Sequence, residues 1–293
     1  MKFVEYPHED TFDYEVRRTC RNCGEEFSGR YCNRCGEKVI VDDDRSLPVF
    51  LRKIFRTIPI LDNKFTRTLR LMLTRPGFVA RNYVDGRRIP FVNPLAIFLV
   101  INFLYFFFPT HQTFNSSLRT QMHFQLHKET ATDMVERHIA GQGITLDEFT
   151  ENYDLHAANV AKMMLVSFTL IMALPFWIAN SSSGLYFRDH LLVSLEFCSM
   201  SVLINNLVIP WTWIGITGLF GYSRPESKEL FNPFISFALF AAVGLALFYF
   251  NERRVYEQSR RRSVFLSFLL LAGLFISLHL YYGVVFFVSM WTL

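Results

Sequence analysis

Four of the five cysteines of this 293-residue chain fall within residues 20–35, in two Cys-x-x-Cys-Gly steps. The ligand set is Cys20, Cys23, Cys32 and Cys35. Each step places two thiolates on a tight turn, and the Gly that follows permits a positive φ, so that backbone N–H groups can face the sulfurs. Four thiolates in tetrahedral array suit Zn²⁺, although iron binds the same set. The spacing therefore predicts one zinc site in a ribbon spanning residues 17–40.

This site is expected to be structural, because four protein ligands leave no open coordination position. So short a segment cannot bury enough core to fold without a metal. A redox dithiol pair and disulfides are the alternatives. The N-terminus carries no cleavable signal peptide pattern, so residues 1–16 are predicted to be flexible and cytoplasmic, in a reducing compartment that favours metal over disulfides. Cys198 lies in an apolar run and is expected to be an inert buried thiol.

The ribbon carries six basic and three acidic side chains between Arg17 and Lys38. That excess could contact nucleic acid or anionic lipid head groups. Nucleic acid is disfavoured because no stripe of aromatic and basic residues is evident. A protein partner at the cytoplasmic face is the default expectation for a ribbon attached to a membrane domain.

A second group of candidate residues is polar and stands within apolar runs: Glu196, Asn205, Asn206 and His279. Such side chains are costly in hydrocarbon and are expected to face the interior of a helix bundle. Their simplest role is hydrogen bonding between helices, and a proton or solute pathway is the alternative. His279 and the two asparagines are expected at comparable depth, where they could hydrogen-bond.

Two histidines, His123 and His127, have the i, i+4 spacing of paired metal ligands. The surrounding sequence lacks the His-Glu-x-x-His pattern, so a mobile, partly helical loop is the preferred interpretation. No nucleophile elbow, phosphate loop or catalytic triad is recognisable, so no catalytic residue is assigned and enzymatic activity is not favoured.

The composition places these residues in a membrane protein. The chain is 51% hydrophobic and only 19% charged, with 32 phenylalanines, and its mean hydropathy is +0.20. Apolar runs long enough to cross a bilayer predict an all-α integral membrane protein with about five transmembrane helices within residues 94–293. The predicted spans are 94–109, 160–180, 190–210, 231–250 and 264–291. The first is short and could be re-entrant, and Pro210 is expected to break or kink the third.

Basic residues near the ends of the spans predict the orientation. Residues 1–93 hold 18 of the 30 Lys and Arg, loop 251–263 has five arginines, and loop 110–159 has three basic residues against seven acidic ones. The N-terminus and loop 251–263 are therefore predicted to lie on the cytoplasmic side of a bacterial inner membrane. Loop 110–159 and the C-terminus are predicted on the other side.

Residues 46–93 are predicted to form basic amphipathic helices at the membrane interface, with Asp62 as a helix N-cap. The alternative is that they pack on the bundle and leave their arginines solvated. Arg75-Pro76-Gly77 is expected to end the helix, because Pro cannot continue its hydrogen bonding. Arg87 and Arg88 follow in a turn and could hold lipid phosphate, although a role as topology anchors is favoured.

In order, these motifs resemble those of an uncharacterised bacterial family of multi-pass membrane proteins with an N-terminal zinc ribbon. The shared features cover about residues 18–108: the Cys-x-x-Cys-Gly pair, Arg75-Pro76-Gly77, Tyr83-Val84-Asp85-Gly86-Arg87-Arg88 and Asn93-Pro94. The resemblance implies a multi-pass membrane protein and supplies no reaction. Two minor departures are Glu37-Lys38 after the second cysteine step and Ile89-Pro90-Phe91 before the first span.

The sequence therefore favours a binding or scaffolding protein in the lipid bilayer, with a structural zinc ion in its cytoplasmic ribbon. A transporter or lipid-handling protein that uses the polar residues of the bundle is the alternative. A membrane-bound enzyme working from the histidines of loop 110–159 is the third class. Partner, substrate and oligomeric state are not indicated.

Overall fold

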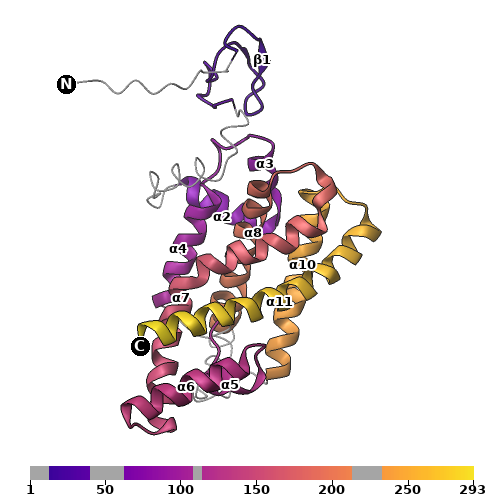
Figure 1. The fold of residues 1–293 in the computed structure, drawn as a ribbon. Helices are drawn as coiled ribbons and strands as arrows, with labels where there is room; N and C mark the ends of the chain where they lie inside the picture. Colours follow the sequence, from indigo (N-terminus) through magenta and orange to yellow (C-terminus); the bar gives the residue numbers. More distant parts are fainter. Residues whose placement is uncertain (1–12, 40–62, 108–113, 213–232) are drawn as a thin grey trace, which may run out of the picture.

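The computed structural model describes residues 13–39, 63–107, 114–212 and 233–293. A two-stranded antiparallel sheet, β1 (Arg18–Thr19) and β2 (Glu26–Phe27), precedes an all-helical remainder. The helices are α2 (Asn63–Thr74), α3 (Phe78–Val84), α4 (Pro94–Phe107), α5 (Leu118–Phe124), α6 (Lys128–Gln142), α7 (Leu146–Ala179), α8 (Phe187–Val202), α10 (Pro233–Arg254) and α11 (Arg260–Thr292). The small sheet lies at one end of the molecule, and α5 and α6 lie at the opposite end (Figure 1).

Helix α8 forms the centre of the bundle. Every residue from Arg188 to Val202 is buried, and α8 packs against α3, α4, α7 and α10. Three phenylalanine rings join α7, α8 and α10: Phe197 stacks on Phe248 at 4.4 Å between centroids, and Phe176 meets both edge-on. Because α8 is enclosed on all sides, its many polar residues face protein.

Three helices of the described residues are long and apolar enough to cross a membrane: Leu146–Ala179, Phe187–Thr212 and Arg260–Thr292. Helices α7 and α11 pack along each other and turn large apolar side chains outward, among them Leu170, Trp177, Phe265 and Ile276. The predicted count of five spans stays a prediction. Helix α4 is apolar but has 14 residues, and α10 follows residues 213–232, which lie outside the described part.

Pro210 does not break the third predicted span. The helix continues as a π-helical segment, Leu203–Val208, and then runs to Thr212. Proline has no N–H and its ring crowds the preceding turn, so the wider π turn just before it accommodates the residue without ending the helix. The helix Phe187–Thr212 therefore extends beyond the predicted span 190–210 at both ends.

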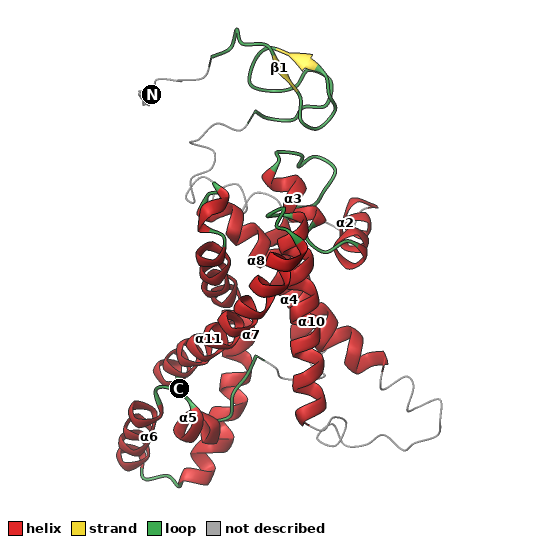
Figure 2. Cartoon of the chain, turned by 90° about the vertical axis from the view of Figure 1, so that its right-hand side faces the viewer, coloured by secondary structure: helices red, strands yellow, loops and turns green. Residues whose placement is uncertain are grey.

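The predicted loop 110–159 contains more helix than expected. Residues 146–159 belong to α7, and α5 and α6 precede them. These helices share a small core with the end of α11, in which Val135, Phe149, Tyr153 and Phe286 are fully or almost fully buried. The far end of α11 is thereby fixed beside the start of α7, as Figure 2 shows.

The described part of the amphipathic stretch, residues 63–93, contains α2 and α3. In α2, Phe65 and Met72 are buried in the main core, while Arg67 and Arg70 are exposed. This packing corresponds to the alternative in which the stretch lies on the bundle and leaves its arginines solvated. The helix ends before Arg75-Pro76-Gly77, as predicted. Residues 46–62, with the predicted cap Asp62, lie outside the described residues.

Candidate metal centre and its attachment to the membrane domain

The four predicted cysteine ligands come together in the ribbon. Their sulfur atoms all lie within 4.8 Å of one another, with 3.6 Å between Cys20 and Cys35 and 3.6 Å between Cys23 and Cys32. Within the described residues, this is the one cluster of three or more Cys, His, Asp or Glu side chains that could hold a metal ion.

The two cysteine steps have the same backbone structure. Gly24 donates to the Cys20 carbonyl at 2.9 Å, and Gly36 donates to the Cys32 carbonyl at 2.8 Å. Both glycines have positive φ, 78° and 72°, which confirms the role predicted for them. These two turns present the sulfurs to a common centre, because each one closes a loop around its own pair of cysteines.

The four thiols are close enough together to bind one cation as thiolates. Burial raises the pKa of the Cys20 thiol. The Glu25 N–H would lower the pKa of Cys23, but burial and the neighbouring sulfurs outweigh it and raise the pKa to about 12. Hydrogen bonds from the Asn22 side chain and the Glu37 N–H lower the pKa of Cys35 to about 6. Four thiolates at this spacing repel one another, so all four ionise together only around a metal ion.

The sulfur geometry fits a tetrahedral metal ion. A zinc–sulfur distance of about 2.3 Å implies about 3.8 Å between sulfurs in a tetrahedron, close to the two separations of 3.6 Å. All four positions would be filled by protein, so such an ion would support the fold and not activate water. The identity of the metal is not fixed by this geometry, because iron–sulfur bonds have a similar length.

The ribbon is attached to the membrane domain through the turn that links α3 to α4. Arg21 donates to the Asp85 carbonyl at 3.3 Å, and the Ile89 N–H donates to the Glu37 carboxylate at 3.3 Å. Glu37 is 8% exposed. Burial raises the pKa of this carboxyl, whereas the Ile89 N–H and the charge of Arg88 oppose the rise. Glu37, noted in the sequence only as a departure from the family pattern, is thus a contact between the two parts.

The two arginines of this turn differ in environment. Arg87 is exposed. The Nε and Nη2 atoms of Arg88 are buried and have no hydrogen-bond partner among the described residues. Burial lowers the pKa of the Arg88 guanidinium, and the charge of Arg188 lowers it further, against the opposing effect of Glu37. A contact of Arg87 or Arg88 with lipid phosphate stays a prediction.

Glu196 connects this region to the centre of the bundle. Its carboxylate accepts the N–H of Gly77 at 2.8 Å and the N–H of Ala80 at 2.5 Å. These N–H groups belong to the first turn of α3, where no carbonyl of the preceding turn is available. Gly77 has a φ of 82°, and an added Cβ would lie 3.0 Å from Asn251 Oδ1. The Arg75-Pro76-Gly77 turn therefore ends α2 and presents the Gly77 N–H to Glu196, while Ala80 in the first turn of α3 supplies the second N–H.

The C-terminal end of α10 holds the other side of the same turn. Arg254 donates to the Pro76 carbonyl at 2.6 Å. Arg81 donates to the Val255 carbonyl at 2.8 Å and also pairs with Asp85 and Glu257. The sequence predicted only that loop 251–263 is cytoplasmic. It did not predict these contacts, because no local sequence pattern shows which loops meet in the fold.

The other predicted polar residues have separate partners. Asn205 donates to the Ser201 carbonyl at 3.1 Å on its own helix, and Asn206 is fully buried in the π-helical segment. His279 is half-buried and contacts the Phe275 carbonyl at 2.8 Å, also on its own helix. These bonds of Asn205 and His279 stay within their own helices and do not join the two residues as predicted.

The paired histidines do not share a metal site among the described residues. His127 packs against the rings of Phe286 and Phe287, while His123 lies against Phe124. Burial lowers the pKa of His127, which favours the neutral imidazole of an apolar contact. These contacts give His127 a packing role at the junction between α6 and α11.

A buried polar network near the Arg75-Pro76-Gly77 turn was missed by sequence reasoning. His190 Nδ1 lies 2.8 Å from Tyr256 Oη, and their rings stack. Asn180 donates to Glu252 Oε1 at 2.8 Å. Asn180 and His190 lie at the ends of predicted spans, and Glu252 and Tyr256 lie in the predicted loop 251–263, where polar side chains are ordinary. Their burial depends on the meeting of α7, α8 and α10, which no local pattern reveals.

Comparison with known proteins gives one family match. A family described as "Protein of unknown function (DUF3667)" matches residues 62–106. No curated protein and no solved structure matches the chain. The matched segment includes α2, α3 and all but the last residue of α4. It is similar to that family over the part of the chain that receives the ribbon on one side and the Glu196 carboxylate on the other.

Proposed function

We propose that this chain is a multi-pass protein of a bacterial inner membrane that binds a partner protein at its cytoplasmic face. In this proposal, the ribbon folds around one structural zinc ion and is presented on the membrane domain. Its chemical role is recognition, because a site with four protein ligands leaves the metal no position for a substrate.

The observation that carries the proposal is the attachment of the ribbon through Arg21 and Glu37 to the turn at residues 85–89. The helix before that turn, α3, is held at its start by α8 and α10, because Glu196 accepts the Gly77 N–H and Arg254 donates to the Pro76 carbonyl. A ribbon held in this way has a defined orientation on the bundle. A defined orientation reduces the conformational entropy that a partner must remove on binding.

The arrangement of helix ends supports the predicted orientation in the membrane. Loop 251–263, with its five arginines, contacts the Arg75-Pro76-Gly77 turn through Arg254 and α3 through Val255, and α3 leads directly into the turn that receives the ribbon. The acidic segment containing α5 and α6 lies at the other end, beside the C-terminal end of α11 (Figure 1). The basic regions therefore share one end, as the positive-inside rule requires of a cytoplasmic face.

The environment of Glu196 weakens the support for a transporter. This carboxylate was the strongest candidate for an intramembrane pathway, because an acid in an apolar run is costly. Both of its oxygens accept backbone N–H groups, so it has a structural reason to be there. The binding role then needs no chemistry from the interior of the bundle.

The test is a cross-linking pull-down from membranes that compares the wild type with Cys20→Ser/Cys23→Ser, with zinc measured on the same samples. We expect the double variant to lose both zinc and a specific cross-linked partner. Cys198→Ser is the matched control, because this thiol is buried in α8, away from the ribbon, and should retain both. Loss of zinc with an unchanged set of cross-linked partners would show that the zinc-bound ribbon is not needed for partner binding, and would overturn the proposal.

A further inference from the structure

Two large apolar side chains are exposed at the turn between α5 and α6. Phe124 is 78% exposed and Leu126 is 82% exposed. The turn lies at the end of the molecule opposite the ribbon (Figure 1). Leaving two neighbouring apolar side chains of this size in water is costly, so together they indicate a contact surface. The proposed partner contact of the ribbon does not account for it.

The turn packs closely against α11. Gln121 donates to the Tyr282 carbonyl at 3.3 Å, and the ring centroids of His127 and Phe287 are 5.6 Å apart. A Cβ added at Gly283 would lie 3.5 Å from His127 Nδ1. The position of the turn is therefore fixed relative to residues 282–287 of α11.

Phe287 belongs to a stripe of exposed apolar residues along α11. The members of this apolar stripe recur at helical spacing and are 43–88% exposed: Phe265, Leu269, Ile276, Leu280, Phe287 and Trp291. Helix α11 is one of the three helices of the described residues that are long and apolar enough to cross a membrane, and this stripe is the surface that it would turn towards lipid. The α5–α6 turn adjoins the stripe at Phe287.

The contacts of α5 place its two ends at different depths. The Leu118 N–H donates to the Asp154 carboxylate at 2.7 Å, and Asp154 lies on the polar part of α7, before the predicted span 160–180. Gln121, one turn further along α5, reaches Tyr282, which lies within the predicted span 264–291. Helix α5 therefore runs from the polar side towards the boundary of the bilayer, and the turn follows at that boundary.

The composition of the turn suits this depth. Residues 120–127 contain no Lys, Arg, Asp or Glu, while Arg119 and Lys128 stand on either side and are exposed. Long basic side chains beside an apolar segment can extend to lipid phosphate groups while the segment between them enters the bilayer. No charged residue therefore opposes the insertion of Phe124 and Leu126.

We propose that the α5–α6 turn inserts into the lipid bilayer, with Phe124 and Leu126 among the acyl chains of the leaflet opposite the ribbon. Lipid is the occupant because the turn continues the apolar stripe of α11. Inserted in this way, α5 and α6 anchor one end of the bundle at the membrane surface, as interfacial helices do. This inference rests on the membrane location in the proposed function and is independent of partner binding.

The experiment uses the full-length protein in liposomes, with the photoreactive residue p-benzoylphenylalanine in place of Phe124. After irradiation, mass spectrometry identifies adducts with lipid acyl chains. Ala140→p-benzoylphenylalanine is the matched control, because Ala140 is exposed near the far end of α6. We expect about tenfold more acyl-chain adduct at position 124 than at position 140, since burial of one large apolar side chain favours insertion by at least that ratio. Equal adduct at both positions would overturn the proposal.

A third probe position separates the inserted turn from the membrane location itself. Phe268→p-benzoylphenylalanine places the probe on an exposed position of α11, where acyl-chain adducts are expected if this helix crosses the bilayer. Adducts at 268 without adducts at 124 would overturn the insertion of the turn and leave the membrane location intact. Adducts at neither position would overturn both. A cross-link from position 124 to a second copy of the chain, in place of lipid, would identify a dimer contact and overturn the proposal.

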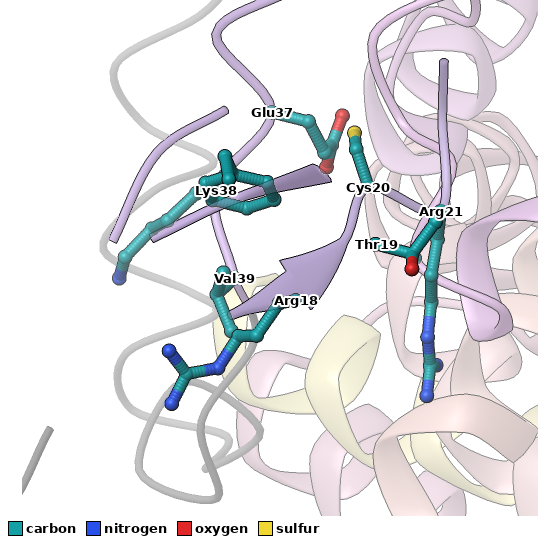
Figure 3. A pocket seen from close by; sticks show the side chains of 9 residues that line it. Arg18, Thr19, Cys20, Arg21, Glu37, Lys38 and Val39 are labelled. Carbon is teal, nitrogen blue, oxygen red and sulfur yellow. The ribbon is translucent and has the colours of Figure 1, made fainter. Parts of the chain in front are cut away.

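The ribbon provides the separation from partner binding. It lies at the other end of the molecule, where Arg18, Cys20 and Glu37 line a cavity with Gly86 of the turn between α3 and α4 (Figure 3). Loss of zinc in Cys20→Ser/Cys23→Ser should therefore abolish partner capture and leave the acyl-chain adducts at position 124 unchanged. Loss of these adducts in the double variant would contradict a membrane anchor that is independent of the ribbon.

Discussion

The carboxylate of Glu196 lies 2.8 Å from the backbone nitrogen of Gly77, although 119 residues separate them in the sequence. This contact joins the central helix of the bundle to the turn that ends α2 and begins α3. Glu196 stands within an apolar run, and this contact gives it a structural role there. An anion at the first turn of a helix accepts hydrogen bonds from N–H groups that have no other acceptor.

Replacing this acid should destabilise the bundle. Glu196→Leu would leave the N–H groups of Gly77 and Ala80 buried without an acceptor, at a cost of roughly 2–4 kcal/mol. Glu196→Gln keeps one acceptor oxygen and should cost less. Thermal unfolding of the purified protein in detergent measures the difference. Ser199→Ala is the control, since Ser199 is buried on the same helix and bonds only its own Leu195 carbonyl.

The sequence predicted only that Glu196 faces the interior of the bundle, with hydrogen bonding between helices as its simplest role. The structure identifies its partners as the N–H groups of Gly77 and Ala80. Equal stability of Glu196→Leu and Ser199→Ala would show that the carboxylate does not hold α3.

Gly77→Ala should be more harmful than the same change at another glycine with positive φ. At Gly77 an added Cβ would lie 3.0 Å from Asn251 Oδ1 and 3.3 Å from Asn251 Cα, whereas at Gly143 nothing lies within 4 Å. At both positions, alanine in the left-handed conformation should lower the free energy of unfolding by roughly 1–2 kcal/mol. The extra loss at Gly77, measured by the unfolding midpoint, then reports the close approach of α10. Similar losses at both positions would contradict that approach.

The contacts of Arg81 should be unequal in strength. Its ion pair with Glu257 involves an acid that is 69% exposed, so Glu257→Gln should cost less than about 0.5 kcal/mol. Arg81→Gln also removes the bond to the Val255 carbonyl and should cost about 1–2 kcal/mol. Unfolding of the two variants at low and high salt gives both values. A larger loss for Glu257→Gln would reverse this ranking.

The attachment of the ribbon can be measured at one amide. Because the Ile89 N–H donates to Glu37, Glu37→Ala should speed hydrogen exchange at Ile89 by about tenfold. Arg34→Ala is the control, since in the described part of the chain Arg34 pairs with exposed Glu25 of the ribbon, and its loss should leave this amide protected. Unchanged exchange at Ile89 in Glu37→Ala would indicate that the ribbon is held by other contacts.

The sequence predicted features that depend on local pattern. The four cysteines, the positive φ of Gly24 and Gly36, and the end of α2 before Pro76 all follow from short-range chemistry, and the structure agrees on the last two. The sulfur positions fit the predicted ligand set. Apolar runs located the long helices, although α7 begins 14 residues before the predicted span, at Leu146, because its first turns are polar and pack on α6.

The remaining features depend on which distant segments meet. Glu196 could be recognised as an acid that needs donors, but its donors could have come from any neighbouring helix. Arg254 and Val255 were counted as part of a basic loop, and nothing near them in the sequence points to Pro76 or Arg81. The attachment through Glu37 was hidden for the same reason, since its partner Ile89 is a backbone amide and carries no side-chain signature.

The proposed function depends on a ribbon that four cysteines fold around one metal ion on the membrane domain. Elemental analysis of the purified full-length protein measures this ion. We expect one zinc ion per chain in the wild type and in Cys198→Ser, and essentially none in Cys20→Ser/Cys23→Ser. A wild-type protein without bound metal, or a double variant that keeps its zinc, would show that these cysteines do not form the metal site.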